Sequence, residues 1–183
     1  FKNNTKKENI SDINFLSLCG GFPLKHNEFR YKFSWTPLGV LKALKSKAKF
    51  ITSFKETTSS FPFENITKLN FLKEVFETYP NRDSLPYLEE YKLSDYKNVI
   101  KHFERGTIRL NDWGQAWKEI FIKIKKGDDL EKLSEELWIN NQYESDENDR
   151  VLLIVKLQAK DFNKNDIFNK TLFIDESRVI KNS

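Results

Sequence analysis

Aromatic side chains supply much of the apolar material of this 183-residue chain and limit the kind of core it can build. Only 38% of the residues are hydrophobic, against roughly 45–50% in ordinary soluble domains. Sixteen Phe and four Trp belong to that fraction, while 32% of the residues are charged. A chain of this length forms about one domain. We therefore expect one domain whose core is small and rich in aromatic rings.

The cysteine and histidine content excludes several classes of protein. One Cys forms no disulfide framework, and together with two His it is too few for a structural zinc site. The longest aliphatic run, Val151–Val155, is far shorter than the ~20 residues that cross a bilayer. The first ten residues contain no apolar leader. The sequence predicts a soluble, cytoplasmic protein with no membrane partner and no metal site.

Motifs that cradle phosphate groups are absent from the sequence. Neither Gly-x-Gly-x-x-Gly nor Gly-x-x-x-x-Gly-Lys-Ser/Thr occurs, and the only adjacent glycines are Gly20 and Gly21. If the chain belongs to a cofactor enzyme, the part that binds the cofactor lies outside it. We therefore assign no cofactor-binding residue to this chain.

Hydrophobic periodicity predicts an α+β fold, with a mostly antiparallel or mixed sheet that carries helices on one face. Strands are expected at 14–19 (ending in a turn at 20–23), 29–35, 50–54, 71–78 and 103–110, and as a hairpin of 151–159 and 169–175. Helices are expected after Thr36 and Pro37, from an Asp112 cap to Gly127, and from Asp128 onward. Residues 1–12 are expected to be flexible, and 13–183 to form the domain.

The first fifty residues are basic, with ten Lys and Arg against three Asp and Glu. Aromatic and polar residues alternate in one stretch of this segment, Phe29, Arg30, Tyr31, Lys32, Phe33, Ser34 and Trp35. Rings flanked by cations suit the stacking of single-stranded nucleic-acid bases. An amphipathic strand with a buried aromatic face accounts for the same pattern and is the favoured interpretation. Nucleic-acid binding remains an alternative to be tested by the burial of these rings.

Each of the other candidate groups has a purely structural interpretation as well as a functional one. Cys19 ends a predicted strand, but no base or cation partner for a nucleophile is evident near it in the sequence, so an inert, buried side chain is expected. The loop 81–83 (Asn-Arg-Asp) offers a guanidinium fork for a substrate carboxylate, or forms a turn in which Arg82 pairs with Asp83. Arg105 and Arg109 share one face of a strand and form either an anion site or edge charges. The acidic run 144–149 lacks calcium-loop spacing, so a solvated turn is expected.

Four blocks of sequence resemble the catalytic domain of the glutamate-forming saccharopine dehydrogenase family. They read FLSLCGGFP (15–23), YKFSWTPLG (31–39), YPNRDSLPY (79–87) and RGTIR (105–109), in the order and spacing of that family. Residues 144–152 match more weakly. The resemblance covers roughly residues 14–155 and implies a domain like the C-terminal domain of glyceraldehyde-3-phosphate-dehydrogenase-like folds.

The resemblance implies a function in lysine metabolism. Members oxidise saccharopine with NAD or NADP to glutamate and aminoadipate semialdehyde, and a Rossmann domain of the same polypeptide holds the nicotinamide. This chain would be the second domain, which shapes the substrate pocket and takes part in a homodimer. It would bind no cofactor and would be inactive alone, since hydride transfer needs a held nicotinamide. A related carboxynorspermidine dehydrogenase or homospermidine synthase type remains an alternative.

The same resemblance supplies candidate substrate-binding residues, around the turn at 35–38 and near 60–62, while no catalytic residue is assigned. The full set is Cys19, Gly20, Gly21, Ser34, Trp35, Leu38, Ser60, Phe61, Pro62, Asn81, Arg82 and Arg109. Leu38 departs from the family, since many members have an arginine there that would bind a carboxylate. We therefore expect another guanidinium, Arg82 first and Arg109 second, to serve the pocket.

Overall fold

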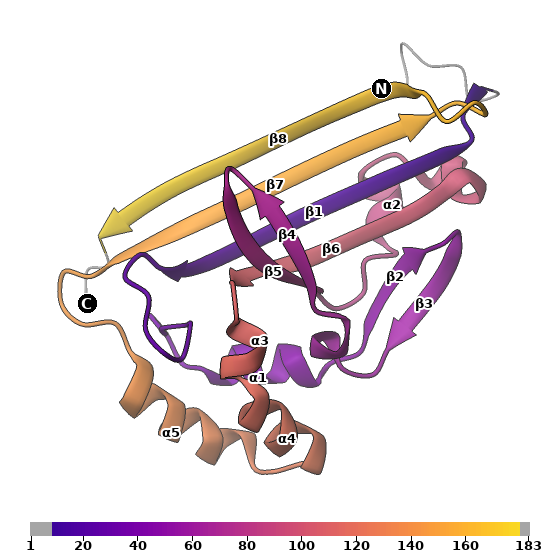
Figure 1. Ribbon diagram of the computed structural model, residues 1–183. Coiled ribbons are helices and arrows are strands. Elements are labelled where there is room, and N and C mark those ends of the chain that lie inside the picture. Colours follow the sequence, from indigo (N-terminus) through magenta and orange to yellow (C-terminus); the bar gives the residue numbers. More distant parts are fainter. Residues whose placement is uncertain (1–8, 180–183) are drawn as a thin grey trace.

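The computed structural model describes residues 9–179, which form an eight-stranded mixed sheet with short helices (Figure 1). Its strands are β1 (Asp12–Pro23), β2 (Ala48–Thr52), β3 (Lys55–Ser59), β4 (Thr67–Phe71), β5 (Glu74–Pro80), β6 (Ile100–Leu110), β7 (Asn148–Lys160) and β8 (Asp166–Val179). The sheet order is β3-β2-β6-β1-β7-β8, and β5 pairs with the second half of β6 while β4 pairs with β5. β1 and β6 run parallel, and the other strand pairs are antiparallel. The expected α+β class with a mixed sheet is confirmed.

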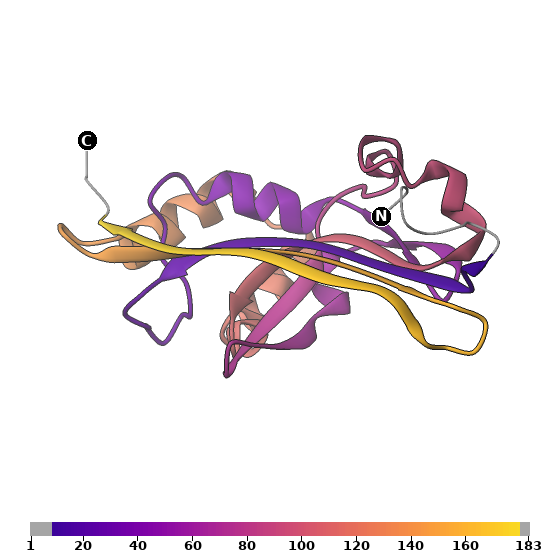
Figure 2. The same cartoon turned by 90° about the horizontal axis from the view of Figure 1, so that it is seen from above.

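The helices are short, and most of them gather below β6 in the view of Figure 1. They are α1 (Leu38–Lys45), α2 (Tyr87–Glu90), α3 (Trp113–Ala116), α4 (Lys118–Lys126) and α5 (Leu130–Asn141), with 3-10 helices η2 (Pro62–Asn65) and η3 (Ser94–Val99). Seen along the sheet, α1, α5 and α2 lie on one side of it, and the β4–β5 hairpin crosses the other side (Figure 2).

Three apolar clusters hold these layers together. The largest joins the helices to the 29–33 segment and centres on Trp113 and Trp117, both fully buried. A second lies between the sheet and α2 with η3, around Phe15 and Phe103, whose rings stack at 5.0 Å. The third lies under the β4–β5 hairpin and includes Phe76. Each cluster contains aromatic rings at its centre, as the composition predicts.

The expected end of β1 at the glycine pair is wrong. β1 continues through Gly20 and Gly21 to Pro23, paired with β7 along its whole length. A Cβ on Gly20 would overlap the carbonyl oxygen of Ile108 on β6. This glycine therefore permits two strands to approach each other closely rather than making a turn.

The expected strand at 29–35 is also wrong, although Tyr31 and Phe33 are buried as the aromatic alternation predicted. Arg30 has a positive φ of 57°, and the segment makes only one isolated bridge, between Phe33 and Gln142. Tyr31 and Phe33 are buried, and both rings lie against Trp117 at 5.7 and 6.1 Å. Trp35, the third ring of the suggested stacking face, is 55% exposed. Two of the three rings are therefore unavailable for stacking on bases, and the nucleic-acid alternative loses most of its basis.

The helix predictions hold better than the predicted caps. α1 follows Pro37, and Gly127 ends α4 with a φ of +82°. The predicted cap at Asp112 is wrong, because the backbone of this residue is in the left-handed region and its side chain makes no cap hydrogen bond. The single helix predicted from Asp112 to Gly127 is interrupted at Trp117 and forms α3 and α4. Asp129 caps α5 instead, accepting bonds from the backbone N–H groups of Glu131 and Lys132.

The segment expected to be flexible lies outside the described residues over positions 1–8. Within its last residues, Ile10 is buried in the cluster under α2, and β1 already begins at Asp12. Over residues 9–179, no helix is long and apolar enough to cross a membrane.

The Trp117→Ala variant tests the aromatic core. Trp117 is fully buried and its indole N–H donates to the Phe29 carbonyl at 3.1 Å. Deleting such a ring costs about 3–5 kcal/mol of unfolding free energy. Trp35→Ala, which removes a ring that is 55% exposed, serves as control and should change stability by only about 0.5 kcal/mol. Chemical denaturation of both variants measures the difference, and equal losses would contradict the assigned core.

The Asp175→Asn variant tests the cross-strand ion pair of β7 and β8. The Arg150 guanidinium donates to both Asp175 oxygens at 2.7 and 2.8 Å, and these two bonds lower the pKa of Asp175 below its ordinary value. Arg150 also binds Glu74. A carboxyl with a lowered folded pKa stabilises the fold above its unfolded pKa. The variant should therefore lose about 1–2 kcal/mol at neutral pH. That deficit should shrink as the pH falls through the lowered pKa, and a pH-independent deficit in denaturation would contradict the assignment.

Candidate functional site

A cavity of about 240 Å³ opens between α1, the end of β5 and the second half of β6. Its lining residues are Tyr31, Trp35, Gly39, Val40, Ala43, Tyr79, Asn81, Arg82, Thr107 and Arg109. Four of the residues expected at a substrate site therefore meet here, namely Trp35, Asn81, Arg82 and Arg109. The cavity contains two guanidiniums and no carboxylate among its lining residues.

Arg109 is the dominant charge of this cavity. Its side chain is 6% exposed, and its guanidinium lies over three rings, 4.7 Å from the centroid of Tyr31, 5.6 Å from that of Tyr79 and 5.4 Å from that of Trp113. One terminal nitrogen donates to the Tyr79 hydroxyl at 2.9 Å. Over residues 9–179, no carboxylate forms an ion pair with it. A buried cation with aromatic neighbours and no counter-ion is suited to bind an anion.

The polar groups around Arg109 are only partly satisfied. Its Nε and the indole nitrogen of Trp113 are buried and have no hydrogen-bond partner. Burial raises the pKa of Tyr79, although the Arg109 cation opposes this effect, so the phenol stays protonated at neutral pH. Burial alone would lower the pKa of Arg109, but the oxygens of Tyr79 and Tyr31 raise it above the ordinary value. The guanidinium thus remains charged, and its Nε–H has no acceptor.

The loop after β5 places Arg82 at the rim of the cavity. The Arg82 backbone has a φ of 57°, and its carbonyl accepts a bond from the Lys49 N–H at 2.9 Å. Asp83 pairs with Lys49 at 3.3 Å and accepts a bond from the Leu85 N–H. The pairing of Arg82 with Asp83 that the sequence offered as an alternative is therefore not formed, and the exposed Arg82 side chain faces the cavity.

Trp35 and Gly39 form the opposite wall. The Trp35 indole lies across the first turn of α1, and a Cβ on Gly39 would overlap its six-membered ring. Glycine at this position therefore allows the ring to lie flat on the helix beside the cavity. Leu38 lines no part of the cavity and packs half-buried on the helical core.

Several expected site residues lie apart from the cavity. The expected burial of Cys19 is wrong, since the residue is exposed on β1, in register with Thr107, which lines the cavity. Gly20 and Gly21 are residues of the same strand and do not line the cavity. Ser34, Ser60, Phe61 and Pro62 do not line it either, and Pro62 is buried at the start of η2. Phe61 stacks on Phe63 at 5.3 Å and belongs with the helical core.

The sequence reasoning assigned no site role to Tyr79, Thr107, Val40 and Ala43, which line the cavity. The sequence could have indicated Thr107, because it lies between Arg105 and Arg109 on the same face of β6. No sequence pattern indicates Tyr79, because its hydroxyl meets Arg109 only through the pairing of β5 with β6.

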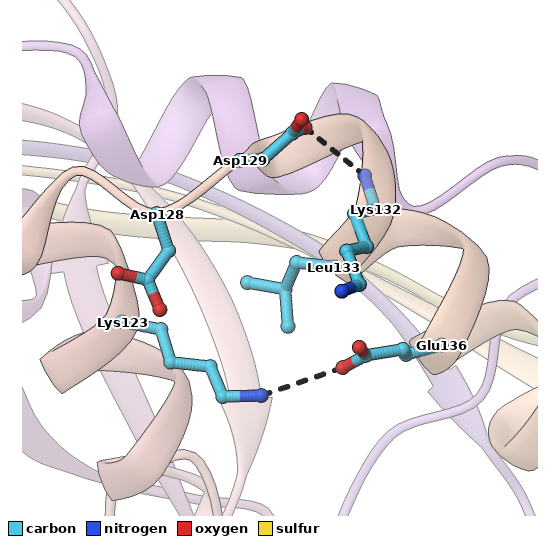
Figure 3. Close-up of a pocket in the computed structure, with 6 residues that line it drawn as sticks. All are labelled: Lys123, Asp128, Asp129, Lys132, Leu133 and Glu136. Carbon is cyan, nitrogen blue, oxygen red and sulfur yellow. Dashed lines mark hydrogen bonds and ion pairs between the residues drawn. The ribbon is translucent and has the colours of Figure 1, made fainter.

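A second hollow, of about 360 Å³, lies between α4 and α5 and is lined by charged side chains (Figure 3). Lys123 pairs there with Glu136 at 3.4 Å, and Asp129 caps α5. Because Lys123 is paired with Glu136 and most of the charged residues are exposed, we interpret it as a solvated seam between two helices. No group of three or more His, Cys, Asp or Glu side chains within residues 9–179 is arranged to hold a metal ion.

Comparison with known proteins adds independent findings. A family model described as the saccharopine dehydrogenase C-terminal domain matches residues 2–180. The chain is 40% identical over 116 residues to a saccharopine dehydrogenase [NADP(+), L-glutamate-forming] of Pyricularia oryzae, which covers 60% of the chain and 24% of that protein. It is 34% identical over 117 residues to the mitochondrial alpha-aminoadipic semialdehyde synthase of Mus musculus, again covering 60% of the chain but 12% of that protein.

A solved structure shows the same fold. The apo histidine-tagged saccharopine dehydrogenase (L-Glu forming) from Saccharomyces cerevisiae superposes with a TM-score of 0.73 at 20% identity, covering 96% of the chain and 55% of that protein. The chain therefore spans about half of this structure and about a quarter or less of the curated relatives.

Proposed function

We propose that this chain, which belongs to the family of saccharopine dehydrogenase C-terminal domains, is the substrate-binding domain of an NADP- or NAD-dependent oxidoreductase of lysine metabolism. The proposed reaction is the oxidation of saccharopine to glutamate and aminoadipate semialdehyde. The observation that carries this proposal is the buried, unpaired guanidinium of Arg109 in a cavity with no acid. The NADP-dependent relatives named above support the cofactor class.

The role of the cavity is to bind one carboxylate of saccharopine, which has three. A carboxylate loses its hydration on entering a closed site, and a guanidinium fork offsets that cost through paired charge-assisted bonds. Arg109 offers its free Nε–H, and Arg82 adds a second cation at the rim. Because Leu38 has no charge, these arginines supply the charge that position 38 provides in many members of the family.

The nicotinamide would be held by another domain of the same polypeptide. The chain has no Gly-rich turn between a strand and a helix that could cradle a pyrophosphate. We therefore propose that the hydride acceptor is held outside residues 1–183 and that the chain alone is inactive. The cytoplasmic location expected from the sequence stays a prediction.

Self-association is part of the proposal. β8 is an edge strand of the sheet, and Leu172 and Ile174 on it are 69% and 54% exposed. Exposed apolar groups along a strand edge favour contact with another surface. This feature supports the homodimer expected from the family resemblance.

Replacing Arg109 by lysine tests the carboxylate site. Lysine keeps a positive charge but loses the planar fork. In the whole oxidoreductase, Arg109→Lys should lower kcat/KM for saccharopine about 10- to 150-fold, which corresponds to one lost charge-assisted bond. Arg30→Lys, a change outside the cavity, is the matched control. An effect on the melting temperature without an effect on KM would make Arg109 purely structural.

Dinucleotide binding by the isolated chain tests whether another domain holds the cofactor. Without a phosphate-binding turn, we expect no heat of binding for NADP or NAD in a calorimetric titration. Binding at micromolar concentration would show that this chain contains the cofactor site and would overturn the proposed two-domain arrangement.

A further inference from the structure

We propose that the same face of β6 contains a second recognition position, centred on Arg105, which binds an α-amino acid end of the substrate. Its carboxylate would bind Arg105 and its ammonium group would bind Glu90. This inference rests on the proposed function and extends it, because it would make the site select a ligand with charged groups at both ends.

Arg105 resembles Arg109 in having donors without an acceptor. Its guanidinium carbon lies 3.5 Å from the centroid of the Tyr87 ring, and its Nε is buried with no hydrogen-bond partner. Stacking on a ring occupies the face of a guanidinium and leaves the N–H donors at its edge available. No carboxylate within residues 9–179 forms an ion pair with Arg105. The stacked fork is therefore oriented and still has donors to offer.

The strand register places Arg105 on the same side of the sheet as the cavity. In the parallel pairing of β1 with β6, Ser17 is opposite Arg105 and Cys19 is opposite Thr107. Alternate residues of a strand share a face, so Arg105, Thr107 and Arg109 point to one side. Four residues of strand separate the two arginine backbones by roughly 13 Å. A ligand that reaches both guanidiniums must therefore be long and must have acidic groups near both ends.

The space beside Arg105 is suited to an amino acid. A hollow of about 680 Å³ is lined by Pro86, Tyr87, Glu90 and Tyr91, so the ring that stacks on Arg105 also forms a wall of the hollow. Tyr91 lies over the sheet, with its hydroxyl 3.5 Å from the Ser17 hydroxyl. Within residues 9–179 Glu90 forms no ion pair, and it is exposed in this hollow. Arg105 itself is not a wall of the hollow but lies against the Tyr87 ring that is one. Its guanidinium and the Glu90 carboxylate carry the two charges that would complement those of an α-amino acid.

The contrast with the Arg109 cavity fixes the expected orientation of the ligand. No acidic residue lines that cavity, so it suits a carboxylate without a neighbouring ammonium group. Saccharopine has an amino acid end, with a carboxylate beside a free amine, and two further carboxylates beyond its secondary amine. The amino acid end should therefore lie at Arg105 and Glu90, and a distal carboxylate at Arg109.

Steady-state kinetics of the whole oxidoreductase test this inference. Arg105→Lys and Glu90→Gln should each raise KM for saccharopine about tenfold. Both should leave the inhibition constant of butyrate, which has one carboxylate and no amine, within about twofold of the wild-type value. Arg109→Lys should weaken both ligands. Lys101→Gln, an exposed change on the same strand, is the matched control, and melting temperatures report the folding of every variant.

Three results would overturn the inference. If Arg105→Lys and Glu90→Gln change KM no more than Lys101→Gln while Arg109→Lys raises it, the second position is wrong and the proposed function stands. If the Arg105 and Glu90 variants weaken butyrate as much as saccharopine, the two positions are not separate. If the wild-type protein neither binds nor oxidises saccharopine, the proposed function fails together with the inference.

Discussion

The arrangement around Arg109 depends on one unfavourable circumstance, a buried positive charge without a negative partner. Removing a charge from water costs several kcal/mol unless other groups replace the lost hydration. Here the replacement is incomplete, because Arg109 has one good bond, to the Tyr79 hydroxyl, and three aromatic faces. Cation–π contacts of this kind contribute about 0.5–2 kcal/mol each. They hold the guanidinium in place and still leave it with an unused donor.

The three rings around Arg109 come from separate parts of the chain and meet only in the folded state. Tyr79 is provided by β5, Trp113 by α3, and Tyr31 by the irregular segment before α1. Trp117 links these parts, since its indole binds the Phe29 carbonyl and its ring contacts Tyr31 and Trp113. The aromatic composition of the chain therefore serves two purposes. It replaces scarce aliphatic residues in the core, and it supplies the faces against which a buried cation is tolerated.

Local patterns predicted those elements whose residues interact mainly with near neighbours. The stripe of Val40, Leu41 and Leu44 fixed α1, and the β7–β8 hairpin followed from two apolar runs around a polar turn. The turn expected at Gly20 and Gly21 is not formed, and the close approach of Gly20 to Ile108 could not be predicted because Ile108 lies on a strand more than eighty residues away. The alternation at 29–35 gave the burial of Tyr31 and Phe33 but no strand, since the segment packs on Trp117 instead of pairing. Asp112 failed as a cap because its backbone is left-handed.

The site was partly predictable for the same reason. The spacing of Arg105 and Arg109 shows from sequence alone that they share a face of one strand, and family-like blocks drew attention to Trp35, Asn81 and Arg82. No pattern revealed Tyr79 as the partner of Arg109, because β5 reaches β6 through a register that only the fold defines. The segment 60–62 was expected at the pocket, whereas Phe61 packs against the helical core and Pro62 is buried at the start of η2.

The most direct test is a crystal structure of the whole oxidoreductase with saccharopine bound. The account predicts that a saccharopine carboxylate lies within hydrogen-bond distance, about 2.7–2.9 Å, of Arg109 Nε, in the cavity between α1, β5 and β6. Saccharopine bound elsewhere, with Arg109 touching only protein and water, would contradict it.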